Sequence, residues 1–323
     1  MIQLILSRIA QSILIILAMT IIVFVGLNAV GNPVDTLIAP NAGQAERLRA
    51  IQALGLDQPL WKQYLLFLGN AMQGNLGLSF VSGEPALQLI LSRLPATIEL
   101  AVIAVFSALV IGVPIGMLAG VYPKSWLSRA IMGFSVVGFS LPAFWVALML
   151  IIVFAVQLGW LPSSGRGETV SLLGIQVSFL TVDGIRHLIL PAISLGLYKF
   201  CLVVRLVRAG VMEVSQMEYV KFARAKGLRM RRVIFLHMLK NIMIPVVTVV
   251  GLELGGTIAF AVVTESIFAW PGVGRLIIQS IGVLDRPVII AYLMIVVVLF
   301  VVLNLLTDLA YAALDPRVRG RTA

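Results

Sequence analysis

Side chains that could do chemistry are few in this sequence and lie far apart. The two histidines, His187 and His237, do not have the spacing of a two-histidine metal motif. The single cysteine, Cys201, lies in an apolar run, which favours packing over a metal cluster or a disulfide. The sequence has no Gly-x-x-x-x-Gly-Lys motif for nucleotide phosphates and no Gly-x-Ser-x-Gly nucleophile motif. We therefore expect no catalytic residue, no cofactor and no metal site.

A second set of titratable residues interrupts long apolar runs: Glu99, Lys199, Glu253, Glu265 and Asp308. A charge is costly in an apolar medium, so each should face a partner helix or a water-filled cavity. For Glu253 two interpretations stay open: it lines a pathway, or its carboxylate is hydrogen-bonded within a helix bundle. We expect Glu99 and Glu265 to be structural anchors near the outer surface.

Seven basic residues gather in the segment 213–245, which we call the basic segment: Lys221, Arg224, Lys226, Arg229, Arg231, Arg232 and Lys240. Its pattern predicts a helix, a break at Gly227 and a second basic helix. Attraction to anionic lipid would account for such charge at about 1 kcal/mol per residue. However, Ala223, Ala225 and Gly227 leave room for another protein, where a lipid anchor would carry bulky apolar groups.

The composition indicates that the rest of the chain lies in a membrane. The 323 residues are 60% hydrophobic and 12% charged, with a mean hydropathy of +1.05, as expected for a chain whose solvent is lipid. The net charge of +10 could suggest nucleic acid. The excess sits in short loops between apolar runs, however, so we expect contact with membrane lipid and none with nucleic acid.

Six apolar runs are long enough to cross a bilayer as helices, so the predicted fold class is an all-α polytopic membrane protein with six transmembrane helices. The runs are Ile9–Asn28, Thr97–Val121, Ile131–Leu158, Leu188–Val207, Val246–Phe268 and Val288–Ala313. Pro114 and Pro142 fall inside the second and third runs and are predicted to kink them. Kinks suit a gated pathway but are common in membrane bundles generally.

The distribution of Lys and Arg predicts the orientation. With the N-terminus in the cytoplasm, fifteen of the 24 basic residues fall on the cytoplasmic side, eight fall outside, and Lys199 lies within a run. We therefore expect both termini to be cytoplasmic. Outside, amphipathic patterns at Trp61–Leu68 and Ala86–Leu94 predict a small folded cap, and alternation over Val170–Phe179 predicts a short hairpin.

Several motifs together resemble those of one transporter family. They are Ala223-Arg224-Ala225-Lys226-Gly227 followed by Asn241-x-x-Ile244-Pro245, Gly55-Leu56-Asp57-Gln58-Pro59, Gly74-Asn75-Leu76-Gly77-Leu78-Ser79, Leu94-Pro95-Ala96-Thr97-x-Glu99-Leu100, His187-Leu188-Ile189-Leu190-Pro191-Ala192, Phe268-Ala269-Trp270-Pro271-Gly272-Val273-Gly274-Arg275 and Ala313-Leu314-Asp315-Pro316-Arg317. Over nearly its whole length the chain resembles permease subunits of bacterial ATP-binding-cassette importers. Lys221-Phe222-Ala223 in place of Glu-Ala-Ala, and a longer distance from Gly227 to Pro245, resemble the dipeptide, oligopeptide and nickel branch.

This resemblance implies a type I importer fold in the bacterial inner membrane. It also implies a second, homologous permease as heterodimer partner, two cytoplasmic ATPase subunits and an extracytoplasmic solute-binding protein. The predicted domains are an N-terminal helix with its cap (1–96), a permease domain (97–313) and a cytoplasmic tail (314–323). The residues expected to couple to the ATPase are Tyr219, Lys221, Phe222, Ala223, Arg224, Ala225, Lys226, Gly227, Arg231 and Arg232, and the possible pathway or gating positions are Pro114, Pro142 and Glu253.

Peptide is the favoured solute by this resemblance, with a nickel chelate or a glutathione-like solute as alternatives. A secondary transporter driven by an ion gradient is the rival from another class, although it would usually show internal repeats and more intramembrane charge pairs. An intramembrane enzyme is a third alternative, which lacks candidate catalytic groups.

Overall fold

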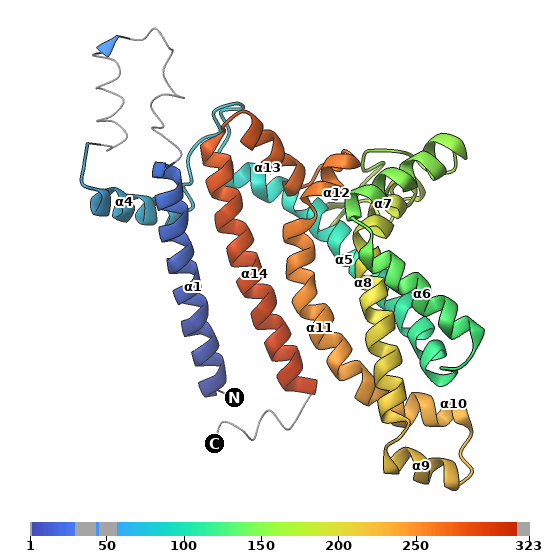
Figure 1. Ribbon diagram of the computed structural model, residues 1–323. Coiled ribbons are helices and arrows are strands. Elements are labelled where there is room, and N and C mark those ends of the chain that lie inside the picture. Colours follow the sequence, from blue (N-terminus) through green and yellow to red (C-terminus); the bar gives the residue numbers. More distant parts are fainter. Residues whose placement is uncertain (1, 30–42, 45–56, 315–323) are drawn as a thin grey trace. The chain divides into compact units, whose positions relative to one another are not determined.

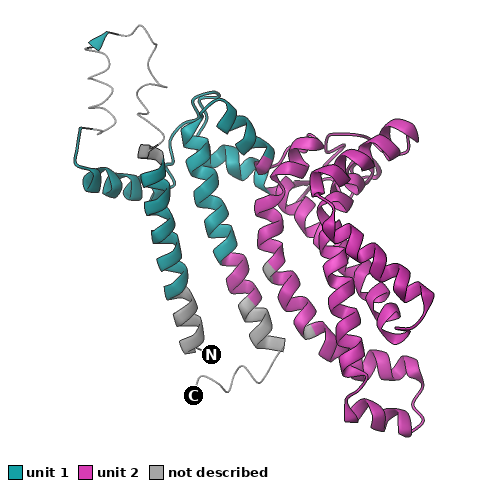
Figure 2. Ribbon diagram, viewed as in Figure 1, with its two compact units in different colours: residues 1–94, 275–301 teal, residues 95–274, 302–323 magenta. Residues whose placement is uncertain are grey.

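The computed structural model describes residues 2–29, 43–44 and 57–314, most of which are helical (Figure 1). Part of the expected cap, including Gly55 and Leu56, and the expected tail from Asp315 onward lie outside the described residues. The chain forms two compact units, which Figure 2 distinguishes by colour. Unit 1 contains residues 1–94 and 275–301, and unit 2 contains residues 95–274 and 302–323.

Unit 1 contains α1 (Ile2–Ala29), α4 (Leu60–Met72), the start of α5 (Ala86–Val121), most of α13 (Val273–Gly282) and the start of α14 (Arg286–Leu314). Helix α4 and the start of α5 confirm the two amphipathic patterns. The turn between α13 and α14 is fixed by Asp285, which is 2% exposed. Its carboxylate accepts from the Ser79 hydroxyl at 2.5 Å and the Phe80 amide at 3.1 Å, so the two distant segments form one joint.

Unit 2 is a bundle around the long helix α8. Its elements are the rest of α5 and α14, together with α6 (Trp126–Ser140), α7 (Ala143–Leu150), the π-helical turn η1 (Ile151–Gln157), β1 (Val170–Leu172), β2 (Ile175–Val177), α8 (Val182–Val214), α9 (Glu218–Ala225), α10 (Met230–Arg232), the π-helical turn η2 (Val233–Met238), α11 (Leu239–Phe260) and α12 (Val262–Ile267).

Three glycines on one face of α5 allow that helix to approach α8 closely. Gly112, Gly116 and Gly120 are spaced four residues apart, which places them on one stripe. A Cβ atom added at Gly116 would lie 2.8 Å from a backbone oxygen of α8, and one added at Gly120 would lie 2.5 Å from Val211 Cβ. Such stripes of small residues are typical of tightly packed membrane helices.

In the described part of the chain, three helices are long and apolar enough to cross a membrane: Ala86–Val121, Val182–Val214 and Arg286–Thr307. The number rises to five if the bent pairs Trp126–Ser140 with Ala143–Gln157, and Met230–Met243 with Pro245–Phe260, each form one span. The first expected run corresponds to the apolar part of α1, Ala10–Gly26. The predicted helical membrane fold is thus confirmed. Helix α5 continues through Pro114 without a break.

The third expected span, Ile131–Leu158, is not one kinked helix, because the chain leaves the helical conformation before Pro142. Leu141 ends α6 with an extended backbone, ψ 132°, and Pro142 precedes α7 with ψ 134°. The helices on either side are bent by 107°. The cause is local: a proline ring disfavours the helical conformation of the residue before it. The predicted kink at Pro142 is therefore a full break.

The hairpin expected over Val170–Phe179 is confirmed. Strands β1 and β2 are antiparallel, with Val170 opposite Val177. Leu173 and Gly174 form the two-residue turn with φ of 52° and 83°. Positive φ at both positions matches a type I′ turn, whose twist suits a hairpin.

Candidate functional site

Helix α9, the first helix of the basic segment, has two faces in different environments. Val220 and Ala223 are 0% and 5% exposed and belong to the largest apolar core of unit 2. Phe222 lies between them in sequence and is 62% exposed. At the helix start, Lys221 donates to Glu218 at 2.8 Å on the exposed surface. One face therefore fixes α9 to its own chain, and the other is open to a partner.

Gly227 ends α9 in the way its sequence position predicts. Its φ is +76°, a left-handed conformation that glycine adopts without a steric cost. The Gly227 amide donates to the Arg224 carbonyl at 2.9 Å, and the Leu228 amide donates to the Ala223 carbonyl at 3.3 Å. This pair of bonds is a Schellman motif. The expected order of helix, glycine break and second helix is confirmed, because α10 begins at Met230.

The open face of the basic segment combines cations with an aromatic ring. Its exposed side chains include Lys221, Phe222, Arg224, Ala225, Lys226, Arg229, Arg231 and Arg232. Lys226 Nζ stands 4.5 Å from the centre of the Phe222 ring. Asn241 Nδ2 donates to the Tyr219 hydroxyl at 2.5 Å and so joins α9 to α11. Among the described residues, Lys221 is the one basic side chain of this segment in an ion pair.

A continuous apolar seam joins α9 to the two helices on either side of it in sequence. From α8 it includes Val207, Val211 and Val214, and the residues that follow α9 contribute Val233, Met238, Ile242, Val246 and Val250. Interiors of this kind are closely packed, so they transmit displacement rather than absorb it. A force on α9 would therefore reach both α8 and α11.

Beyond the seam, an ion pair joins α8 to α11. Lys199 Nζ contacts Glu253 Oε2, with side-chain exposures of 14% and 34%. The Lys199 ammonium also lies 4.8 Å from the centre of the Tyr198 ring. Glu253 is thus bonded within the bundle, which agrees with the second of the two interpretations from the sequence. Its role in a pathway stays a prediction.

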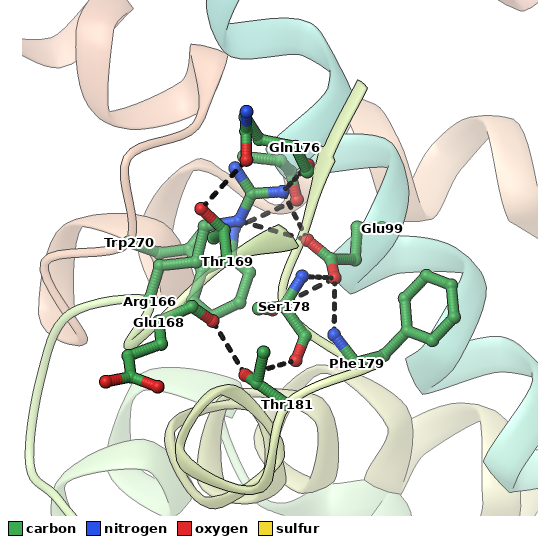
Figure 3. Close-up of polar contacts among 10 residues, drawn as sticks. Glu99, Arg166, Glu168, Thr169, Gln176, Ser178, Phe179, Thr181 and Trp270 are labelled. Atoms are coloured by element: carbon green, nitrogen blue, oxygen red, sulfur yellow. Dashed lines mark hydrogen bonds and ion pairs between the residues drawn. The ribbon is translucent and has the colours of Figure 1, made fainter. Parts of the chain in front are cut away.

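A second polar cluster lies at the other end of α8 and is centred on Glu99 of α5 (Figure 3). The Glu99 side chain is 4% exposed. One carboxylate oxygen accepts from Arg166 Nε at 3.0 Å and Nη2 at 2.5 Å. The other accepts from the amides of Ser178 and Phe179 at 2.6 and 3.0 Å. Glu99 therefore holds the segment that contains the hairpin against α5, as its predicted anchor role requires.

Glu265 of α12 forms the neighbouring joint and is fully buried. Thr97 donates its hydroxyl proton to Glu265 Oε1 at 2.6 Å and accepts from the Val273 amide at 2.8 Å. The buried Trp270 indole donates to the Ala96 carbonyl at 2.9 Å. A side chain at Gly272 would collide with the Glu265 carboxylate. Two motifs far apart in sequence, at 94–100 and 268–275, thus form one packed joint, and Glu265 is the anchor it was predicted to be.

Within the described part of the chain, no group of three His, Cys, Asp or Glu residues could hold a metal ion. The Nδ1 atom of His187 lies 2.9 Å from the Asp183 carbonyl oxygen, and His237 lies in η2.

One residue of the expected coupling set has a different environment from the others. Ala223 was predicted to leave room for another protein, but its side chain packs into the core of this chain. Sequence reasoning also missed three features: the partner of Glu99, the pairing of Lys199 with Glu253, and the glycine stripe of α5. The four-residue spacing of Gly112, Gly116 and Gly120 was the available signal for the stripe.

Comparison with known proteins decides the family. Residues 112–320 match the family described as binding-protein-dependent transport system inner membrane component, and residues 1–101 match its N-terminal region. The chain belongs to this family. As a member, it is a multi-pass protein of the bacterial inner membrane.

Relatives of this family resemble the chain over almost its full length. It is 37% identical to the dipeptide transport system permease protein DppB of Alkalihalophilus pseudofirmus over 97% of this chain and 98% of the relative. It is 40% identical to the oligopeptide transport system permease protein AppB of Bacillus subtilis over 97% and 98%. It is 36% identical to DppB of Escherichia coli K12 over 99% and 100%.

The fold is also shared with a solved structure of the MetNI methionine ABC transporter in an inward-facing conformation. The TM-score is 0.55 at 17% sequence identity, and the match covers 72% of this chain and 99% of the other. At this level of sequence identity the similarity shows a shared fold alone.

Proposed function

We propose that this chain is a membrane permease subunit of an ATP-driven importer, and that it forms part of the pathway for dipeptides or oligopeptides. The near full-length similarity to relatives named as dipeptide and oligopeptide permeases carries the proposal. ATP hydrolysis would occur in two separate cytoplasmic subunits. A second, homologous permease would complete the pathway, and an extracytoplasmic binding protein would deliver the solute.

The basic segment is the proposed contact with the ATPase subunits. Its support is the contrast between the two faces of α9, because Val220 and Ala223 hold the helix in place while Phe222 and Lys226 point outward together. Arginines near the surface present planar donors that suit carboxylates of a partner. The apolar seam then offers a mechanical path from the ATPase into α8 and α11.

The proposed topology has six spans with both termini in the cytoplasm. The spans would be α1, α5, the bent pair from α6 to η1, α8, the bent pair from α10 to α11, and α14. This order places the basic segment on the cytoplasmic side and the Glu99 cluster on the outer side. The two sites lie at opposite ends of α8, whose 33 residues extend for about 50 Å.

The test is solute uptake by the assembled complex in proteoliposomes. We expect a labelled dipeptide to enter when ATP is inside with the ATPase subunits and binding protein is supplied outside. Uptake should survive collapse of the proton gradient and stop when ATP is depleted. The opposite dependence would overturn the ATP-driven mechanism, and competition by a nickel chelate or glutathione but not by peptides would overturn the solute assignment.

A further inference from the structure

Helix α4 has no buried residue, yet most of its side chains are apolar. At 100° per residue most of its apolar side chains form two adjacent stripes, and Leu66, which is 53% exposed, lies outside both. One contains Tyr64 and Phe67. The other contains Trp61, Leu65, Leu68 and Met72, at spacings of four, three and four residues. Asn70 lies on the side of the helix opposite the second stripe, and Lys62 lies about 90° around the helix from the centre of that stripe.

The Tyr64 stripe packs against α1. The Tyr64 hydroxyl lies 2.8 Å from the Thr20 hydroxyl, within hydrogen-bond distance. The Phe24 ring contacts Tyr64 edge-on at 5.5 Å between centroids and Phe67 at 6.0 Å. These contacts fix the level at which α4 crosses α1 (Figure 1).

That level lies inside the apolar part of α1. Phe24 and Thr20 precede Asn28, the end of the predicted apolar run, by four and eight residues, which corresponds to about 6 and 12 Å along the helix axis. The neighbouring α1 side chains Ile21, Ile22 and Val25 are 50 to 61% exposed, as expected of a helix surrounded by lipid. Interfacial helices insert their apolar face to a similar depth, about 5–10 Å.

The second stripe of α4 is exposed at this depth. Trp61, Leu65 and Met72 are 65%, 55% and 78% exposed. Trp61 suits the boundary between acyl chains and headgroups, where tryptophan is enriched in membrane proteins. Lys62 lies about 90° around the helix from the centre of this stripe. Its ammonium donates to Gln58 Oε1 at 3.0 Å, so the stripe itself carries no charge.

We propose that α4 is an interfacial helix whose stripe of Trp61, Leu65, Leu68 and Met72 binds the acyl chains of a bilayer leaflet. Continuity with the lipid-facing surface of α1 selects lipid as the occupant over a soluble protein. The assignment to the outer leaflet rests on the proposed function and its topology, whereas the embedding rests on the contacts between α4 and α1.

Spin labels on the intact complex in nanodiscs test the embedding. Single cysteines are placed at Leu65 and Met72 in the stripe and at Lys62 and Asn70 as matched controls, in a Cys201→Ala background. All four labelled positions are partly or largely exposed, so the fold should tolerate the labels. We expect the ratio of accessibility to oxygen over accessibility to a nickel chelate to be at least several-fold higher in the stripe than in the controls.

Two outcomes would overturn the embedding. Equal ratios on both sides would place the stripe in water, and protection of Leu65 and Met72 from both reagents would mean that protein covers it. The topology is tested separately with a membrane-impermeant maleimide on the Lys62→Cys variant. Labelling from the cytoplasmic side alone would refute the assignment of α4 to the outer leaflet, and with it the proposed topology. That result would hold even if the ratio of oxygen to nickel-chelate accessibility showed that the stripe is embedded.

Discussion

Neutralising Glu253 is expected to destabilise the helical bundle more than neutralising Lys199, while neutralising both should cost less than either single change. The variants are Glu253→Gln, Lys199→Met and the double variant. The reason is that each single change leaves one charge without its partner between α8 and α11, whereas the double change leaves none.

The magnitude follows from the exposure of the charge that remains. An unpaired charge near the middle of a membrane helix costs about 2.5–3.5 kcal/mol. Glu253→Gln leaves the Lys199 side chain, which is 14% exposed, so we expect a loss of about 2–3 kcal/mol. Lys199→Met leaves the Glu253 side chain, which is 34% exposed and partly screened, so we expect about 1–2 kcal/mol. The double variant should lie within about 1 kcal/mol of the parent.

The assay is the free energy of unfolding in mixed micelles titrated with denaturing detergent, measured for all four proteins of the double-mutant cycle. We expect a coupling energy of about 2–5 kcal/mol between the two positions, which is the sum of the two single losses less the loss in the double variant. Additive losses would mean that the charges act independently, which would refute the ion pair as the bond between α8 and α11. Thr307→Ala, which removes a hydroxyl from α14, serves as a control for general weakening of the bundle.

Three further changes test other parts of the structure. Gly120→Leu should block close packing of α5 on α8 and lower the yield of folded protein several-fold, measured by size-exclusion chromatography. Gly133→Leu should leave the yield unchanged, because a Cβ atom added there meets nothing within 4 Å; equal yields of the two variants would contradict the close approach. Glu99→Gln should raise the rate of proteolytic cleavage within residues 159–181 at least tenfold, because breaking a buried ion pair costs about 3–5 kcal/mol. Thr169→Ala, next to the same hairpin, should change the cleavage rate little. Gly227→Val should lower solute-stimulated ATP hydrolysis of the complex, because a left-handed residue other than glycine costs about 1–2 kcal/mol. Gly227→Asn should keep most of the hydrolysis, and full hydrolysis in the valine variant would remove Gly227 from the coupling mechanism.

Local patterns predicted the local structure well. The alternation of Val170 to Phe179 was sufficient for the hairpin, because a two-residue turn brings adjacent segments together without outside contacts. Gly227 was likewise readable as a helix end, since its left-handed conformation is a property of the residue itself.

Pairings between distant segments could not be predicted in the same way. Glu99 was recognised as an anchor, but its partner Arg166 lies 67 residues away in a loop, and the sequence does not state which distant cation a buried carboxylate meets. The inward position of Ala223 was missed for a similar reason. In a short helix with several small residues, the sequence does not show which face packs into the core. At Pro142 the sequence located the bend, but it does not give the angle at which the next helix begins, which is 107°.

Because α8 is long, a small tilt of this helix displaces both of its ends appreciably. Its first turn adjoins the Glu99 cluster, and its last turn leads into α9. If a helix of this length turned by about 5° around its midpoint, each end would move by about 2 Å in opposite directions. α8 would then act as a lever. A single tilt of this helix would move the basic segment at one end and release the hairpin at the other.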